Sequence, residues 1–233
     1  MSRPDHTPPS PLLLLLEGRA FAEYAGLLLS WPLLHRLPRG DGHSVMVLPG
    51  FGGGDLSTRP LRRALARLGY DAHGWGQGRN TGMRRSVRLA LAQRFEALYR
   101  DNGKLTLIGW SLGGIYAREM ARGSPERVRR VITLGSPFNH HPRANNAHRL
   151  FRWINGGGDT IDWEGFERRR VPPPVPCTAI YTRSDGIVHW RCAMENPAPN
   201  TENIEVRGSH TGLGYNVQVL RVIAERLARP DAP

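Results

Sequence analysis

The chain has 233 residues, which is long enough for one domain with a substantial core. Its 32 Lys and Arg against 20 Asp and Glu give a formal net charge of +12, and Lys104 is the only lysine. Because the arginines are spread along the chain and form no aromatic-interleaved strip, we expect no nucleic-acid partner. Two cysteines, Cys177 and Cys192, are too few for a disulfide framework. They could pair in an exported protein or stay free in a reducing cytosol.

Leu12–Leu34 is the most hydrophobic region of the chain. It does not fit a signal peptide or a membrane span, because the charged residues Glu17, Arg19 and Glu23 interrupt it. On a helical wheel Arg19, Glu23 and Ser30 form a narrow polar stripe, and a helix with so little polar face must bury itself in something. The expected partner is the protein's own domain, and a dimer partner or a membrane surface are the alternatives.

These features divide the chain at about residue 40. Residues 1–40 are expected to form a polar, proline-bearing tail followed by the apolar helix, and residues 41–233 a single α/β domain. The expected location is the cytoplasm, with membrane association through the helix left open.

The stretch Lys104–Arg122 organises the domain. Leu105–Ile108 is a branched apolar run typical of a buried parallel strand, and a helical pattern runs from Ser111 to Gly123. Between them lies Gly109-Trp110-Ser111-Leu112-Gly113. A G-x-S-x-G sequence between strand and helix is the pattern of a nucleophile elbow, in which a strained turn lifts the serine hydroxyl clear of the sheet.

Alternating strand and helix patterns predict a mostly parallel sheet of about six strands flanked by helices. The expected strands are residues 44–48, 70–75, 105–108, 128–134, 178–182 and 203–207. Besides the elbow helix, helices are expected from Ser57-Thr58 with Pro60 to Gly69, from Thr81 or Gly82 onward, and over Tyr215–Leu227. The rhythm breaks over residues 139–174, which we interpret as a short cap with one or two helical turns.

A serine nucleophile needs a base, and the base needs an orienting carboxylate. Asp185 follows the fifth expected strand and His210 follows the sixth, so both fall at the carboxyl edge of the sheet with Ser111. Other acids and histidines fit surface, strand or cap positions better; these are Asp159, Asp162, Glu195, Glu205, His43, His73, His140, His141, His148 and His189.

Acyl transfer also needs hydrogen-bond donors for an oxyanion. The backbone N–H groups of Leu112, next to the serine, and of Phe51, in the loop after the first strand, are the candidates. Candidate substrate contacts are the aromatic residues Trp110, Phe138 and Trp153.

Five motifs carry a family resemblance; they are Pro49-Gly50-Phe51, Gly109–Gly113, Gly135-Ser136-Pro137, Ser184-Asp185-Gly186 and Gly208-Ser209-His210. The chain resembles the α/β-hydrolase superfamily and, within it, bacterial lipase/esterase-type members, from about Gly42 to Leu227. The resemblance implies Ser111 as nucleophile, His210 as base, Asp185 as acid, and Phe51 with Leu112 as oxyanion hole. It implies no cofactor and no metal.

Two departures from the family pattern stand out. Pro49 occupies a position where many lipases have histidine, and the Leu12–Leu34 helix replaces the usual amino-terminal strands. The Gly74–Asn80 motif could serve the active edge or simply the loop structure.

The sequence thus predicts a serine hydrolase that cleaves a small-molecule ester or acyl substrate through an acyl-enzyme. An acyltransferase or thioesterase with the same residues, and a non-catalytic lipid-binding protein, are the alternatives.

Overall fold

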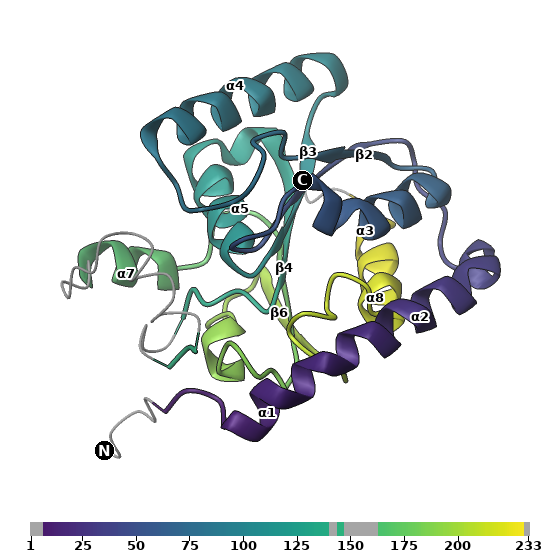
Figure 1. Cartoon of the computed structure of the whole chain (residues 1–233). Helices are drawn as coiled ribbons and strands as arrows, with labels where there is room; N and C mark the ends of the chain where they lie inside the picture. Colours follow the sequence, from purple (N-terminus) through teal and green to yellow (C-terminus); the bar gives the residue numbers. More distant parts are fainter. Residues whose placement is uncertain (1–6, 140–143, 147–162, 231–233) are drawn as a thin grey trace.

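A computed structural model describes residues 7–139, 144–146 and 163–230 (Figure 1). Six strands form one parallel sheet in the order β2-β1-β3-β4-β5-β6. The strands are β1 (Ser44–Leu48), β2 (Asp71–Gly74), β3 (Leu105–Trp110), β4 (Val128–Leu134), β5 (Cys177–Tyr181) and β6 (Thr201–Glu205). The predicted α/β architecture is therefore confirmed, with strand ends displaced by at most two residues from the expected ones.

Helices cover both faces of the sheet, as near-continuous apolar strands require. α4 (Arg85–Asn102) and α5 (Leu112–Gly123) lie on one face. α3 (Asp55–Leu68) and α8 (Val217–Leu227) lie on the other. The side chains of β1 divide accordingly, because Met46 packs with the first pair and Val47 with the second. The core is thus two apolar layers separated by the sheet.

Several helix starts differ from the expected ones. α3 begins at Asp55, so Pro60 lies inside the helix rather than at its first turn. α4 begins only at Arg85, because Gly82 has a left-handed backbone (φ 115°) that a helix cannot contain. α8 begins at Val217, where the side-chain oxygen of Asn216 caps the free N–H groups of the first turn.

The N-terminal region is a nearly unbroken helical rod. It comprises α1 (Pro11–Leu15), η1 (Leu16–Arg19), α2 (Ala20–Ser30) and η2 (Trp31–Arg36). Figure 1 shows this purple rod alongside α8. Leu27 and Leu34 enter the core layer of α3 and α8, so the rod packs on the protein's own domain, as expected.

The outer side of the rod has an unusual composition. The three charged residues of Leu12–Leu34 are partly buried, whereas large apolar side chains face outward. The most exposed are Leu12, Leu15, Phe21, Leu28 and Leu29. A helix on a domain surface ordinarily does the reverse. Among the described residues no helix is long and apolar enough to cross a membrane.

The expected cap falls largely outside the described residues. α7 (Trp163–Arg170) is a helical segment within it. Arg118 of α5 donates hydrogen bonds to the carbonyl oxygens of Arg169 and Val171, which ties the end of this segment to the domain.

Candidate active site

Ser111 sits in the sharp turn between β3 and α5. Its backbone angles are φ 52° and ψ −120°, and it is the only non-glycine residue with positive φ in the described part of the chain. Its N–H donates to the carbonyl of Leu134 at the end of β4 (2.8 Å). Such a conformation is costly for an L-residue and persists only where the surrounding structure enforces it. The geometry is that of the predicted elbow.

Glycines allow neighbouring backbone to approach this turn closely. A Cβ on Gly113 would collide with the carbonyl of Leu48, so β1 reaches the elbow only because that position is glycine. A Cβ on Gly50 would lie 3.2 Å from the Cβ of Ser111. The loop after β1 therefore lies directly against the serine.

Asp185 and His210 form a buried pair, with side chains from the loops after β5 and β6. Asp185 Oδ2 lies 2.7 Å from His210 Nδ1, and the two residues are 3% and 5% exposed. The other carboxylate oxygen, Oδ1, accepts the N–H groups of Ile187 (2.8 Å) and Val188 (2.7 Å). These three hydrogen bonds hold the Asp185 carboxylate in one orientation, with Oδ2 directed at the imidazole.

The surroundings of His210 set its charge preference. Burial alone would lower the pKa of the imidazole, but the Asp185 carboxylate, its hydrogen bond and the charge of Glu17 outweigh burial. The pKa of His210 is therefore raised from its ordinary value. A raised pKa makes the imidazole a stronger proton acceptor once it is neutral.

The end of β4 connects the elbow to this pair. Leu134 binds Ser111 through its carbonyl, and the next residue is Gly135. A Cβ on Gly135 would lie 3.0 Å from His210 Nδ1 and 3.2 Å from Asp185 Oδ2. The serine turn and the Asp–His pair therefore meet around the carboxyl end of one strand, as the sequence predicts.

Asn80 supports the loop after β1. Its side-chain amide donates to the Pro49 carbonyl (2.8 Å), and its backbone binds Gly52 and Gly53 (both 2.7 Å). Arg79 adds a bond from Nε to the Gly52 carbonyl (2.9 Å). The sequence left the role of the Gly74–Asn80 motif undecided. In the structure the motif holds the loop that contains Phe51 in place. Spacing alone could not reveal this, because the partners are about thirty positions away.

The three candidate substrate contacts have different surroundings. Trp110 is mostly buried, and its indole N–H donates to the His210 carbonyl (3.1 Å). Phe138 is fully buried, with the Arg118 guanidinium 3.8 Å from its ring centre. Both residues are therefore buried with partners inside the protein, and Trp110 contacts the site through the His210 backbone. Trp153 lies outside the described residues.

Several rival residues have structural partners. Glu195 forms a buried ion pair with Arg118, and Glu205 binds Arg183 at the surface. His43 and His73 pair with nearby aspartates, and His189 stacks on Trp190. The rivals in the cap, Asp159, Asp162, His140, His141 and His148, lie outside the described residues.

Both cysteines are buried, and neither forms a disulfide. Burial raises the pKa of Cys177 to about 11 and that of Cys192 to about 12, so neither is a ready nucleophile. In the described ranges no three His, Cys, Asp or Glu side chains gather as a metal site would require.

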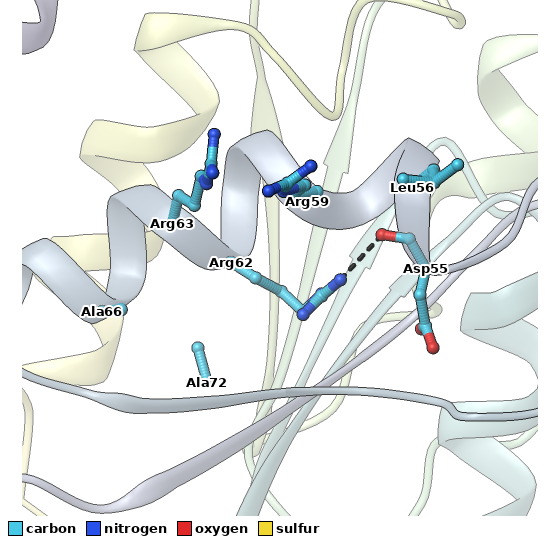
Figure 2. Close-up of a pocket in the computed structure, with 7 residues that line it drawn as sticks. All are labelled: Asp55, Leu56, Arg59, Arg62, Arg63, Ala66 and Ala72. Atoms are coloured by element: carbon cyan, nitrogen blue, oxygen red, sulfur yellow. Dashed lines mark hydrogen bonds between the residues drawn. The ribbon is translucent and has the colours of Figure 1, made fainter.

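A pocket of about 420 Å³ lies between α3 and β2 (Figure 2). Arg62 reaches across it to the Asp55 carbonyl (2.7 Å), and none of Ser111, Asp185 or His210 lines it. Its lining residues are Asp55, Leu56, Arg59, Arg62, Arg63, Ala66 and Ala72.

Comparison with known proteins agrees with the observed fold. Residues 44–151 match the profile of a family described as having the alpha/beta hydrolase fold. The match and the six-stranded parallel sheet both indicate that the chain has the alpha/beta hydrolase fold. Solved structures with a similar fold include one described with the metagenome-derived lipolytic enzymes LipS and LipT. It shares 17% identity with this chain at a TM-score of 0.58, over 82% of this chain and 93% of its own.

Two further hydrolase-fold structures are similar over comparable lengths. The Paleococcus ferrophilus monoacylglycerol lipase has 16% identity and a TM-score of 0.57, covering 82% of this chain and 96% of its own. The thioesterase domain of the curacin biosynthetic pathway has 15% identity and a TM-score of 0.54, covering 83% and 93%. At such identities the likeness establishes the shared hydrolase fold.

Proposed function

We propose that this α/β hydrolase is a serine hydrolase that cleaves carboxylic esters through an acyl-enzyme on Ser111. The observation that carries the proposal is the buried hydrogen bond between Asp185 and His210, at the same strand end as the strained serine turn. An oriented acid–base pair beside an elbow serine is the arrangement that nucleophilic acyl transfer requires. The fold's lipase and esterase neighbours support the ester as the bond broken.

In the proposed reaction the Ser111 hydroxyl attacks the ester carbonyl carbon while His210 accepts the hydroxyl proton. Asp185 keeps Nδ1 protonated, which leaves Nε2 as the accepting atom, and it stabilises the imidazolium that forms. The imidazolium then protonates the departing alkoxide. Water, deprotonated by the same imidazole, then attacks the acyl-serine. The imidazolium returns this proton to the Ser111 oxygen as the acid is released, which regenerates the enzyme.

The tetrahedral oxyanion would be bound by the backbone N–H groups of Phe51 and Leu112. Leu112 is the first residue of α5, so its N–H lies at the positive end of a helix dipole. Gly50, close to Ser111, brings the Phe51 loop beside the serine. One such donor contributes roughly 3 kcal/mol to transition-state binding.

A chain-length series of p-nitrophenyl esters tests the proposal. The wild-type protein should hydrolyse at least one ester, and Ser111→Ala should lose several orders of magnitude in kcat. A fluorophosphonate probe should label the wild type and not the variant. Failure of purified, folded wild-type protein to react with either reagent would favour the non-catalytic lipid-binding alternative.

Transfer of the acyl group, or use of a thioester, would employ the same residues. One solved structure with a similar fold is the thioesterase domain of the curacin pathway, so a thioester is an alternative substrate. Product analysis separates these activities, because an added alcohol acceptor yields a new ester only in an acyltransferase. Parallel assays with acyl thioesters compare kcat/KM directly.

We further propose that the outer face of the N-terminal rod contacts an anionic lipid surface. That face exposes leucines and Phe21, while the charged residues of Leu12–Leu34 turn inward. Continuous apolar helix faces insert into the headgroup region, and a chain of net charge +12 is attracted to anionic lipid. An acyl-ester substrate would be found in the same place.

Vesicle sedimentation tests this contact. Wild-type protein should bind vesicles containing phosphatidylglycerol more tightly than vesicles of phosphatidylcholine alone. The triple variant Leu15→Glu, Phe21→Glu, Leu29→Glu should lose binding, whereas Leu56→Glu, at an equally exposed site on α3, should not. Self-association in sedimentation velocity that the triple variant abolishes, without vesicle binding by the wild type, would instead indicate a dimer interface.

A further inference from the structure

Glu17 of the N-terminal rod bridges the two loops that carry Asp185 and His210. Its Oε1 accepts the N–H of Gly186 (2.8 Å), the residue after Asp185, and the N–H of His210 itself (3.0 Å). Its Oε2 accepts the N–H of Thr211 (2.7 Å). One carboxylate, at least 169 positions earlier in the chain, thus binds three backbone donors across both loops.

Two further side chains of the rod reinforce this bridge. Arg19 donates from one nitrogen to the carbonyl of Ser184 (2.6 Å), just before Asp185, and to the carbonyl of Gly208 (2.8 Å). Glu23 accepts the N–H of Ser209 through Oε1 (2.8 Å), just before His210. The acid and the base are therefore each flanked by contacts to the rod.

The loops are shaped for this contact. A Cβ on Gly186 would collide with the Leu13 carbonyl, and a Cβ on Gly212 would collide with the Glu23 carboxylate. Both loops therefore need glycine where the rod passes. Glu17, together with Glu23 of the polar stripe, supplies acceptors for backbone N–H groups of these loops, which would otherwise lack partners where the rod covers them.

We propose that Glu17 is a positioning residue for the Asp185–His210 pair, and that the N-terminal rod forms part of the catalytic framework. This inference rests on the proposed function. The rod holds the acid loop and the base loop in register through Glu17, and Arg19 and Glu23 make the same connection on either side. Apart from the rod, the two loops are joined by the Asp–His hydrogen bond and by the hydroxyls of Ser184 (2.8 Å) and Thr182 (3.1 Å), which donate to the Gly208 carbonyl.

The charge of Glu17 adds an electrostatic consequence. Two carboxylates contact His210, Asp185 at its imidazole and Glu17 at its backbone N–H, while Arg19 and Glu23 bind the backbone of the preceding residues Gly208 and Ser209. Glu17 contributes to the raised pKa of His210 after Asp185 does, and its own pKa is lowered because three backbone hydrogen bonds outweigh its burial. Removal of this negative charge should therefore lower the pKa of the imidazole.

Glu17→Gln and Glu17→Ala test the proposal, with Glu126→Gln as a charge-matched control on an exposed pair. Gln keeps one acceptor oxygen but loses the charge, so the acid limb of kcat/KM should move to lower pH by roughly 0.5 to 1 unit. Ala removes every acceptor, and kcat should fall on the order of 100-fold with little change in KM. The control should match wild type in both measurements.

Fluorophosphonate titration of active sites separates positioning from loss of folded protein. A normal kcat per labelled site in Glu17→Ala, with an unmoved pH profile in Glu17→Gln, would overturn the proposal. NMR titration of the His210 Cε1–H gives a readout that needs no activity. If the wild-type protein hydrolyses nothing, the proposed function fails, while a shifted His210 titration in Glu17→Gln still upholds the contact and an unshifted one refutes it.

Discussion

The carboxylate of Asp185 and the imidazole of His210 lie 2.7 Å apart, Oδ2 to Nδ1, with both side chains almost wholly buried. Asp185→Asn should keep an acceptor for the N–H groups of Ile187 and Val188, because the amide oxygen can replace Oδ1. Its NH₂ group, however, would face Nδ1 and favour the wrong tautomer. We expect kcat to fall by roughly 10³ to 10⁴ at an almost unchanged Tm, measured by ester hydrolysis and calorimetry. A variant with a tenth of wild-type activity would contradict the assigned role of Asp185.

The raised pKa of His210 predicts the pH dependence of activity. Only the neutral imidazole can accept the serine proton, so kcat/KM should rise with pH through an apparent pKa above the ordinary value of 6.5. The expected measurement is a pH profile between about 5 and 9 with a neutral ester. A midpoint below 6 would contradict the dominance of Asp185 and Glu17 over burial.

The same shift has a consequence for stability. A group whose pKa is higher in the folded than in the unfolded protein binds its proton more tightly when folded. Its stabilising contribution is complete below the unfolded pKa and is lost as pH rises through the folded pKa. Chemical denaturation of His210→Gln and of the wild type should therefore show a difference in the free energy of unfolding. This difference should shrink as the pH rises from about 6 to about 9.

The backbone of Ser111 predicts a trade between stability and activity. At φ 52° a serine is strained, whereas glycine adopts this region freely. Ser111→Gly should raise the free energy of unfolding by about 1 kcal/mol relative to Ser111→Ala, after allowance for the greater freedom of glycine in the unfolded chain. Urea denaturation of the two inactive variants measures the difference, and equal stabilities would argue against strain at the elbow.

Asn80 should matter to both folding and turnover. Asn80→Ala leaves the Pro49 carbonyl without its buried donor, which costs about 1 to 3 kcal/mol. It also loosens the loop with Phe51, so kcat should fall more than KM rises. Arg79→Ala is the matched control, since it removes one exposed bond to the Gly52 carbonyl of the same loop. Similar kcat values for the two variants would show that the buried Asn80 amide contributes no more to turnover than the exposed Arg79 hydrogen bond.

The sequence was sufficient to predict the parallel sheet and to place the serine, the aspartate and the histidine at one edge of it. Branched apolar runs mark the strands, and Ser111, Asp185 and His210 each follow a strand directly, so the parallel topology alone brings them to the same rim. These inferences succeed because they depend on local patterns and on one rule about parallel sheets. Helix starts such as Arg85 were missed where a left-handed glycine, Gly82, decided the boundary.

What the sequence could not supply was long-range pairing. The helical wheel identified Arg19 and Glu23 as a polar stripe, yet nothing local indicates that the stripe meets loops nearly 190 positions away. The leucines of the rod were expected to be buried, but many face outward because the inner side is occupied by hydrogen bonds to those loops. Likewise Trp110 and Phe138 look like binding-site aromatics until their buried partners are known.

The distance along the chain between Glu17 and Thr211 has a consequence for biosynthesis. A ribosome adds about 5 to 20 residues per second, so the leucine-rich rod is synthesised roughly 10 to 40 s before the loops that it binds. During that interval the polar side chains of the rod lack the backbone groups that they bind in the folded protein. The contacts around Asp185 and His210 are therefore completed late in synthesis, when the segment with Thr211 can meet the rod.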